Sequence, residues 1–347
     1  MAQRGGGVNL PSEYKLIKKT IIPLVKSDVA LGDDCGWIDI GKGYVLISSI
    51  DSMNEGIHYK PRWMSFASLA RKIFRVSVSD IAAMGAGEDV SIVVAMGLTR
   101  GTNKRDIAAF AANLRNEAAR FSVKVLGGDI TESQNGNFVS ASVTAKARKK
   151  NLLLRSSARP GEIVWLTGPV GLAGAGLDVL ESNNKRRYKF LARTHLLPVL
   201  RLREGRLISN SGISRCAMDL SDSLAASLFW VSSMSGVSIE ADLSIVKKHK
   251  ALIDWCKQGK RNLQNYLLYG GEDYELLFTS HPRYSSRIRR SLPGAYPIGH
   301  VKDRPKTPLV YVKGIDGERI LIDEDSMGYQ AFNGEVRGKR LEVRSKK

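Results

Sequence analysis

Hydrophobic and polar residues form short blocks along this chain, and the spacing within each block predicts a strand or a helix. Apolar runs predict strands at 37–40, 44–47, 90–96, 123–126 and 163–166, and period-two alternation predicts another at 139–145. Apolar residues at helical spacing predict helices over 13–25, 65–76 and 106–121. The longest apolar run falls well below the roughly 18 residues that a membrane span needs. The pattern therefore predicts a soluble globular protein with no membrane partner.

The length of 347 residues suits two domains of about 150 to 200 residues each. A basic and serine-rich stretch ending in Pro160-Gly161 separates two sets of predicted elements, so we place the domains at 1–152 and 153–347. The first seven residues lack the apolar core of a signal peptide, which predicts a cytoplasmic protein. Three scattered cysteines form no CxxC pair and indicate neither a disulfide framework nor a zinc site.

The charge balance is strongly basic, with 53 Lys and Arg against 34 Asp and Glu and a net charge of +19. A nucleic-acid-binding protein would gather this charge on one face, often beside aromatic residues that stack on bases. Here the basic residues are spread along the chain, with small knots such as 148–150 and 185–187. We therefore do not expect nucleic acid as a partner, and we interpret the charge as a surface that attracts phosphorylated small molecules.

Against this basic background, several aspartates occupy positions where a side chain can face a ligand. Asp51 is expected just after the strand at 44–47, in a segment that continues to His58. Asp129 follows a pair of glycines at the predicted end of another strand, where the backbone can approach a ligand. Asp34 lies in a Gly-Asp-Asp-Cys-Gly turn. Each of these segments is either an ordinary polar loop or a source of oxygen ligands for a hard cation.

Asp80 presents a sharper choice. Phe66, Ile73 and Asp80 are spaced by seven, so a continuous helix would point this carboxylate close to the core, where an unpaired charge is costly. The side chain must then be paired or metal-bound. The alternative is that Asp80 caps a new helix beginning at Ile81.

Two later stretches add further acidic residues. Ser221 and Asp222 would cap the helix that begins near Leu224, but capping leaves Asp219 unexplained, and the group is a plausible corner for metal and phosphate. In 270–278 a glycine turn is followed by three acidic residues within four positions, which resist burial without partners. The glycines at 168–176 lack the G-x-G-x-x-G spacing and the chain has no P-loop, so we interpret them as a strand-to-helix turn.

Taken together, these stretches resemble the thiamine-monophosphate kinase family. Seven motifs occur in the family's order: Gly32-Asp33-Asp34, Asp51 with Glu55-Gly56-Ile57-His58, Ser79-Asp80-Ile81-Ala82-Ala83-Met84-Gly85-Ala86, Gly127-Gly128-Asp129, Arg155-Ser156, Met218-Asp219-Leu220-Ser221-Asp222 and Gly270-Gly271-Glu272-Asp273-Tyr274-Glu275-Leu276. The resemblance implies an α/β, two-domain PurM-like fold whose N-terminal sheet pairs with its twin in a homodimer. It also implies that ATP and thiamine monophosphate give ADP and thiamine diphosphate.

The resemblance further implies roles for single residues. Those matching the family's magnesium positions are Asp34, Ser49, Ile50, Asp51, Asp80, Asp129, Asp219 and Asp222. Those matching its ATP contacts are Gly128, Asp129, Arg155 and Ser221. Those matching its contacts to thiamine phosphate are His58, Glu272 and Tyr329. Because a phosphate monoester with a second pKa of about 6 is already ionised at neutral pH, several Mg²⁺ ions and ATP would suffice without a general base.

The sequence departs from the family pattern in a few places. Ile50 stands where Thr is usual, Ser223 replaces Gly, Ile130 replaces Thr, and Gln330-Ala331 precedes Phe332 in place of Asp-His. A backbone carbonyl at position 50 could still bind metal, and no carboxylate is lost. Among enzymes of the same superfamily, a selenophosphate synthetase would need a reactive cysteine in the N-terminal segment and the hydrogenase-maturation relative a C-terminal one. Neither is present. Another superfamily enzyme acting on a different small phosphorylated substrate remains the alternative.

Overall fold

The computed structural model describes residues 16–25, 32–85, 87–182, 184–324 and 326–327. Of the helix predicted over 13–25, the described part forms a short π-helical turn, Ile17–Ile21, followed by α2, Ile22–Val25. Tyr329 and the basic segment 337–347 lie outside the described residues. None of the described helices is long and apolar enough to cross a membrane.

The first part of the chain builds a five-stranded sheet in the order β1-β2-β5-β3-β4. Its strands are β1 Gly36–Gly41, β2 Tyr44–Asn54, β3 Glu88–Leu98, β4 Lys124–Glu132 and β5 Phe138–Arg148. Only β3 and β4 pair in parallel. β5 alternates between buried and half-buried residues, as the period-two pattern predicts.

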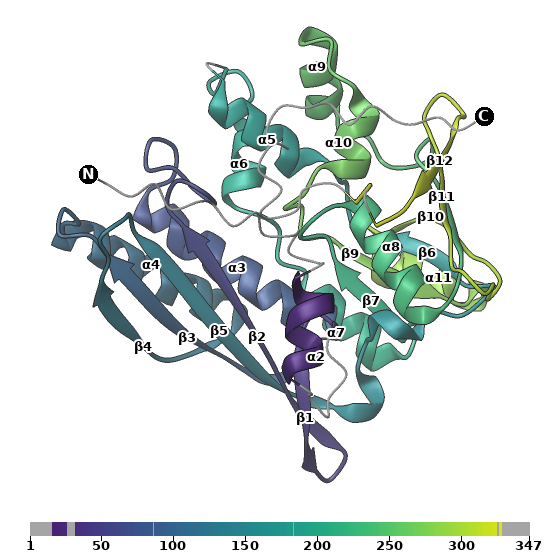
Figure 1. Cartoon of the computed structure of the whole chain (residues 1–347), viewed down its shortest axis with the longest axis horizontal. Coiled ribbons are helices and arrows are strands. Elements are labelled where there is room, and N and C mark those ends of the chain that lie inside the picture. Colours follow the sequence, from purple (N-terminus) through teal and green to yellow (C-terminus); the bar gives the residue numbers. More distant parts are fainter. Residues whose placement is uncertain (1–15, 26–31, 86, 183, 325, 328–347) are drawn as a thin grey trace.

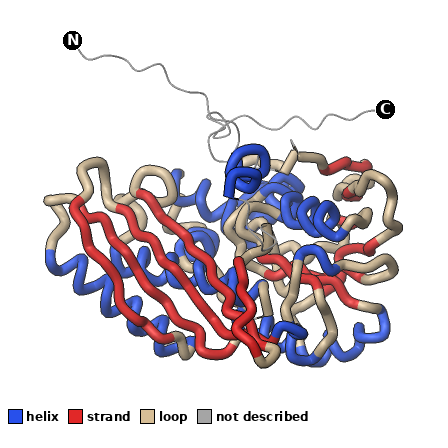
Figure 2. Tube along the Cα trace, turned by 60° about the horizontal axis from the view of Figure 1, so that its bottom comes forward, coloured by secondary structure: helices blue, strands red, loops and turns tan. Residues whose placement is uncertain are grey.

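Two long helices, α3 Phe66–Ala83 and α4 Lys104–Phe121, cover one face of this sheet (Figure 1). Each begins at a residue that caps it: Ser65 accepts a hydrogen bond from the Ser68 N–H, and Asn103 accepts one from the Asp106 N–H. Figure 2 shows the opposite face of the sheet without a helix over it. The apolar side chains that this face exposes include Ile38, Ile50 and Val93.

Two strands continue well past the point where the apolar pattern ends them. β2 continues through Asp51 to Asn54, and β4 continues through Asp129 to Glu132. The prediction that these aspartates follow the ends of strands was therefore wrong. The reason is that backbone pairing continues where the side chains are polar, with β2 in register with β5 as far as the pair Asn54 and Phe138.

The second part of the chain builds a seven-stranded mixed sheet in the order β12-β11-β8-β10-β6-β9-β7. Its strands are β6 Ile163–Leu166, β7 Cys216–Asp219, β8 Ile239–Asp242, β9 Leu276–Ser280, β10 Tyr296–Val301, β11 Val310–Lys313 and β12 Arg319–Ile322. The helices of this part are α5 Leu172–Glu181, α6 Lys189–Leu196, α7 Leu202–Ser211, α8 Leu224–Ser235, α9 Lys250–Gln258, α10 Leu263–Tyr269 and α11 Ser285–Ser291. Short 3-10 turns occur at Lys149–Asn151, Arg155–Ser157 and Pro282–Tyr284.

Helix α3 joins the two parts of the structure. It packs on the first sheet and also contacts β7, α6 and α7 of the second part. The approach to α7 is close, because a Cβ added at Gly205 would lie 2.1 Å from the Ala82 carbonyl oxygen. On the α4 side, buried Arg75 pairs with Glu117 and donates to the Pro198 carbonyl at 2.8 Å. The helix is therefore fixed against both parts, and its backbone is held in a defined place.

Candidate active site

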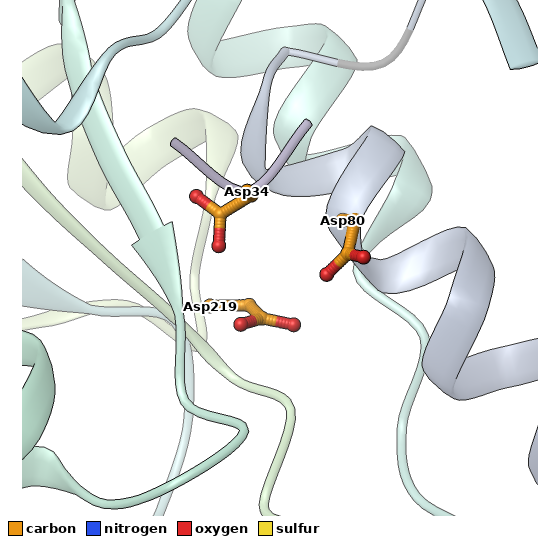
Figure 3. Close-up of side chains that lie close together, drawn as sticks. All are labelled: Asp34, Asp80 and Asp219. Atoms are coloured by element: carbon orange, nitrogen blue, oxygen red, sulfur yellow. The ribbon is translucent and has the colours of Figure 1, made fainter. Parts of the chain in front are cut away.

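Three aspartates from distant parts of the sequence converge where α3 meets the second sheet. One carboxylate oxygen each from Asp34, Asp80 and Asp219 lies within 4.8 Å of the other two. Figure 3 shows the three side chains pointing toward one another, from the loop before β1, the last turn of α3 and the end of β7. The three carboxylates would repel one another without a cation between them.

The last turn of α3 holds this cluster in place. α3 runs without interruption from Phe66 to Ala83, so Asp80 belongs to its C-terminal turn, and the alternative that it caps a new helix was wrong. Ser49 Oγ on β2 donates a hydrogen bond to Asp80 Oδ2. The neighbouring Ser79 donates to Asp219 Oδ2 at 2.6 Å. Ser79 and Asp80, which are adjacent in the last turn of α3, are thus hydrogen-bonded to β7 of the second sheet and β2 of the first.

Other oxygens at this site have no protein partner. Oδ1 of Asp219 and Oδ2 of Asp51 are buried and accept no hydrogen bond from the described residues. Burial raises the pKa of Asp51 and Asp80, and the nearby charge of Asp51 raises that of Asp80 further. Burial and then the charge of Asp34 raise the pKa of Asp219 to about 7. Buried oxygen ligands without donors are the environment that a hard divalent cation such as Mg²⁺ requires, so this set fits that ion.

Arg155 closes one side of the cluster. Its guanidinium contacts both oxygens of Asp34, with Nη2 at 2.6 Å and Nε at 3.3 Å, and its Nη1 donates to the Gly32 carbonyl at 2.9 Å. The Arg155 backbone N–H donates to Asp33 at 2.8 Å. Burial nevertheless raises the pKa of Asp33 to about 6. The result is a fixed, largely buried cation beside the carboxylates, in a position to contact an anionic ligand.

Glu272 and His58 form a second group beside the cluster. Glu272 has one third of its side chain exposed, and its carboxylate contacts Lys72 Nζ at 3.1 Å and His195 Nδ1 at 3.0 Å. Burial is the largest single influence and would raise the pKa of Glu272, but Lys72, His195 and His58 together outweigh it, so the pKa is lowered. His58 accepts a hydrogen bond from the Asn54 N–H at its Nδ1, 3.0 Å away.

Sequence reasoning did not single out Lys72 or His195. The signal was present for Lys72, because it lies between Leu69, Ile73 and Val76 on the apolar face predicted for this helix. A lysine there must have a buried partner. No comparable local signal marks His195, whose contact with Lys72 spans 123 positions in the sequence.

The other two acidic residues of the 270–278 stretch have structural partners. Asp273 accepts hydrogen bonds from the backbone N–H groups of Gly171 and Ala173 at the start of α5. Glu275 forms a two-point ion pair with Arg201, with both contacts at 2.7 Å, and accepts a hydrogen bond from Thr167. The expectation that these acids need partners is confirmed, and the glycines before α5 serve as a strand-to-helix turn.

Ser221 and Asp222 lie in the loop between β7 and α8. Neither caps α8, because Ser223 does so by accepting a hydrogen bond from the Ala226 N–H at 3.0 Å. The capping prediction was therefore wrong, and Ser223 fills a structural role where the family has Gly. The Ser221 carbonyl accepts a hydrogen bond from the Glu272 N–H at 2.7 Å, which places this loop against the Glu272 group.

Gly128 and Asp129 lie apart from the carboxylate cluster within one chain, and the Ile50 side chain points away from it. Asp129 is in register with Ala95, then Ser140, then Ser52, so it shares a sheet face with Ser52 rather than with Asp51. Three strand spacings, or about 14 Å, separate it from β2. Ile50 points to the same uncovered face and is 68% exposed. Gly128 is required by packing, because an added Cβ would lie 2.1 Å from the Val94 carbonyl oxygen.

Comparison with known proteins gives first the class. Residues 32–147 match the family described as AIR synthase related protein, N-terminal domain. This range covers the first sheet, α3 and α4. The N-terminal part of the chain therefore matches the AIR-synthase-related family, and the chain has the PurM-like α/β fold.

Full-length comparisons then give the family. Thiamine-monophosphate kinase from Buchnera aphidicola subsp. Acyrthosiphon pisum is 31% identical over 80% of this chain and 86% of that protein. The enzyme of the same name from Haemophilus influenzae is 29% identical over 81% of this chain and 85% of that protein. The structure of AaThiL complexed with AMPPCP and TMP covers 95% of this chain and 100% of that chain, with a TM-score of 0.81 and 25% identity. This chain belongs to the thiamine-monophosphate kinase family and is a kinase.

Proposed function

We propose that this protein transfers the γ-phosphoryl group of ATP directly to the phosphate of thiamine monophosphate, in a reaction that requires Mg²⁺. The observation that carries the proposal is the convergence of Asp34, Asp80 and Asp219 beside Arg155. This cluster occurs in a chain that aligns over most of its length with proteins named thiamine-monophosphate kinase. Carboxylates without a nucleophile triad suit a transfer in which the substrate itself supplies the nucleophile.

The metal sites are assigned to residues on the helix-covered face of the first sheet and at the end of β7. Asp34, Asp51, Asp80 and Asp219 would hold Mg²⁺, with Ser49 orienting Asp80 and the exposed Asp222 at the rim. Magnesium takes few protein ligands per ion and keeps several waters, so single aspartates suit it better than a dense cage. When bound, Mg²⁺ neutralises phosphate charge and stabilises the leaving oxygen.

The residues of this chain would then bind and orient the two anions. Arg155 is held by Asp34 and so presents its guanidinium to the ATP phosphates without first having to be ordered. Ser221, on the loop after β7, is assigned to the same substrate. His58 and Glu272 are assigned to thiamine monophosphate, as is Tyr329. The acceptor phosphate is already ionised near neutral pH, so no side chain needs to remove a proton from it.

The proposal includes a homodimer, because Asp129 faces the uncovered side of the sheet and, with Gly128, lies on a strand remote from the cluster in one chain, while the Ile50 side chain is exposed on that same side. Pairing two such faces would bury the exposed apolar residues and bring the partner subunit's Asp129 toward this chain's β2. Asp129 and the Ile50 carbonyl would then add to the metal and ATP contacts. We further propose a division into domains at 1–152 and 153–347 and a cytoplasmic location.

A substrate comparison tests the proposal. Purified protein is incubated with ATP and Mg²⁺ and either thiamine monophosphate, thiamine, or another phosphate monoester such as an aminoimidazole ribonucleotide. We expect thiamine diphosphate and ADP from thiamine monophosphate alone. The substrate assignment fails if thiamine diphosphate does not form while another phosphorylated compound is turned over, which would favour a different enzyme of the superfamily.

A further inference from the structure

A fully buried lysine lies on α3, the helix that also carries Asp80. The Lys72 side chain has no solvent exposure and lies among the apolar residues Leu69, Ile73 and Val76. A buried ammonium group is costly unless its donors are used. Its two nearest partners are Glu272 Oε1 at 3.1 Å and His195 Nε2 at 3.2 Å. Both partners come from the second part of the chain.

The contacts of His195 define where its proton lies. The lysine ammonium can only donate, so Nε2, which faces Lys72, must accept. The proton of the neutral ring is therefore on Nδ1, which lies 3.0 Å from Glu272 Oε2 but is not aligned for a hydrogen bond to it. Burial, and then the charge of Lys72, lower the pKa of His195 to about 4, which agrees with a neutral ring. Trp63 packs edge-on against this ring at a centroid distance of 5.8 Å and limits its rotation.

Glu272 is thereby paired with Lys72, which His195 contacts in turn, and is flanked by the His195 ring. Oε1 faces Lys72 and Oε2 faces the His195 ring, while the backbone of Glu272 has a φ of +64° and donates its N–H to the Ser221 carbonyl. A non-glycine residue adopts this left-handed conformation only where its surroundings fix it. The remaining third of the side chain is exposed, and each carboxylate oxygen keeps a lone pair for a further donor.

We infer that Lys72 and His195 are positioning residues that hold Glu272 as an oriented, ionised acceptor for the aminopyrimidine end of thiamine monophosphate. The inference rests on the proposed function. The exocyclic amino group of the pyrimidine is the N–H donor of that substrate, so it is the group that can donate a hydrogen bond to an oriented carboxylate. Lys72 and Asp80 are eight residues apart on one helix, or about 12 Å along its axis. Helix α3 therefore sets the spacing between this acceptor and the carboxylate cluster.

The test compares variants that differ in charge and in hydrogen bonding. Lys72→Met removes the ammonium but keeps an unbranched side chain in the core, whereas Lys72→Arg keeps the charge. His195→Leu removes both ring nitrogens, whereas His195→Gln keeps one donor and one acceptor. Lys302→Met serves as the matched control, because Lys302 pairs with Glu240 on the surface of the second sheet. For each protein we measure thermal stability, kcat, and KM for both substrates.

We expect Lys72→Met and His195→Leu to raise KM for thiamine monophosphate about tenfold or more while KM for ATP changes less than about twofold. Lys72→Arg and His195→Gln should recover most of the loss. The double variant Lys72→Met with Glu272→Gln should be no worse than Lys72→Met alone, because the acceptor is already misplaced. This double variant also removes the unpaired carboxylate, so it keeps the test valid if Lys72→Met is unstable.

A second acceptor, a thiazole ethyl phosphate that lacks the pyrimidine of thiamine monophosphate, distinguishes a loss of pyrimidine recognition from a general loss of catalytic activity. The intact enzyme should turn this compound over poorly, and Lys72→Met should be no worse with it than the intact enzyme is. The inference is overturned if Lys72→Met, folded, keeps its KM for thiamine monophosphate, or if it loses activity equally with both acceptors. An intact protein that never forms thiamine diphosphate would instead refute the proposed function, so the two failures are distinguishable.

Discussion

Asp219→Asn should affect the stability of the metal-free protein and its response to magnesium in opposite ways. The substitution keeps an oxygen that can accept from Ser79 but removes a buried charge beside Asp34 and Asp80. The pKa of Asp219 is raised from 3.8 to about 7, chiefly by burial. At pH 8 its ionisation therefore costs the metal-free fold up to about 4 kcal/mol, since one pKa unit corresponds to about 1.36 kcal/mol.

Only part of this cost should be recovered, because a buried amide also needs partners. A gain of about 1 to 2 kcal/mol would raise the unfolding midpoint in EDTA by roughly 2 to 8 °C. Magnesium at one hundred times its Kd should stabilise the unmodified protein by about 2.7 kcal/mol. The variant should lose most of this increment and most of its kinase activity, because a ligand oxygen of the cluster is gone.

Differential scanning calorimetry at pH 8, in EDTA and in saturating MgCl2, measures both effects on the same samples. Lys302→Met is the control for a substitution outside the site, and its unfolding midpoint should match that of the unmodified protein in both buffers. The reasoning would be refuted if Asp219→Asn melts below the unmodified protein in EDTA and still gains the same stabilisation from magnesium. That result would make Asp219 an ordinary structural acceptor.

Three further perturbations test other parts of the site. Arg155→Lys should raise KM for ATP about tenfold or more, because lysine cannot make the two-point contact with Asp34; steady-state kinetics showing an unchanged KM would contradict this. Val93→Arg on the uncovered sheet face should give an inactive monomer in light scattering, and a fully active monomer would exclude sheet pairing as a requirement for activity. In EDTA, stability should fall as pH rises from about 4 to about 7 and then level off, because over this range folded Asp33 and Asp219 keep protons that the unfolded chain has lost; a flat profile of melting midpoints would be inconsistent with that.

The strands and helices of the first sheet could be predicted because their apolar residues keep a regular period. The pattern fails at the site itself. In β2 the inward-facing positions after Ile47 are Ser49 and Asp51, and the strand continues through them by backbone pairing with β5. When the inward-facing residues of a strand change from apolar to polar, the sequence looks as if the strand has ended. Here the strand continues, and the polar residues are the candidate metal ligands.

The convergence of the aspartates could not be worked out from local pattern. Asp80 and Asp219 are brought together by the packing of α3 against β7, and the contact of Ser79 with Asp219 joins residues 140 positions apart. The order of the motifs indicated which carboxylates match the family's magnesium positions, but it cannot show which of them lie close together in one chain. It assigned Asp129 to the same set, whereas strand register places Asp129 on the opposite face of the sheet. That difference is the physical basis for expecting a second subunit.

Phosphorus NMR of a single reaction mixture tests the central claim most directly. ATP and thiamine monophosphate are supplied in equal amounts with the protein, and magnesium is added in steps. Direct transfer at the carboxylate cluster predicts that ADP and thiamine diphosphate form in equal amounts, without free phosphate, and only once magnesium is present. Formation of ADP and inorganic phosphate without thiamine diphosphate, or full turnover in EDTA, would contradict the account.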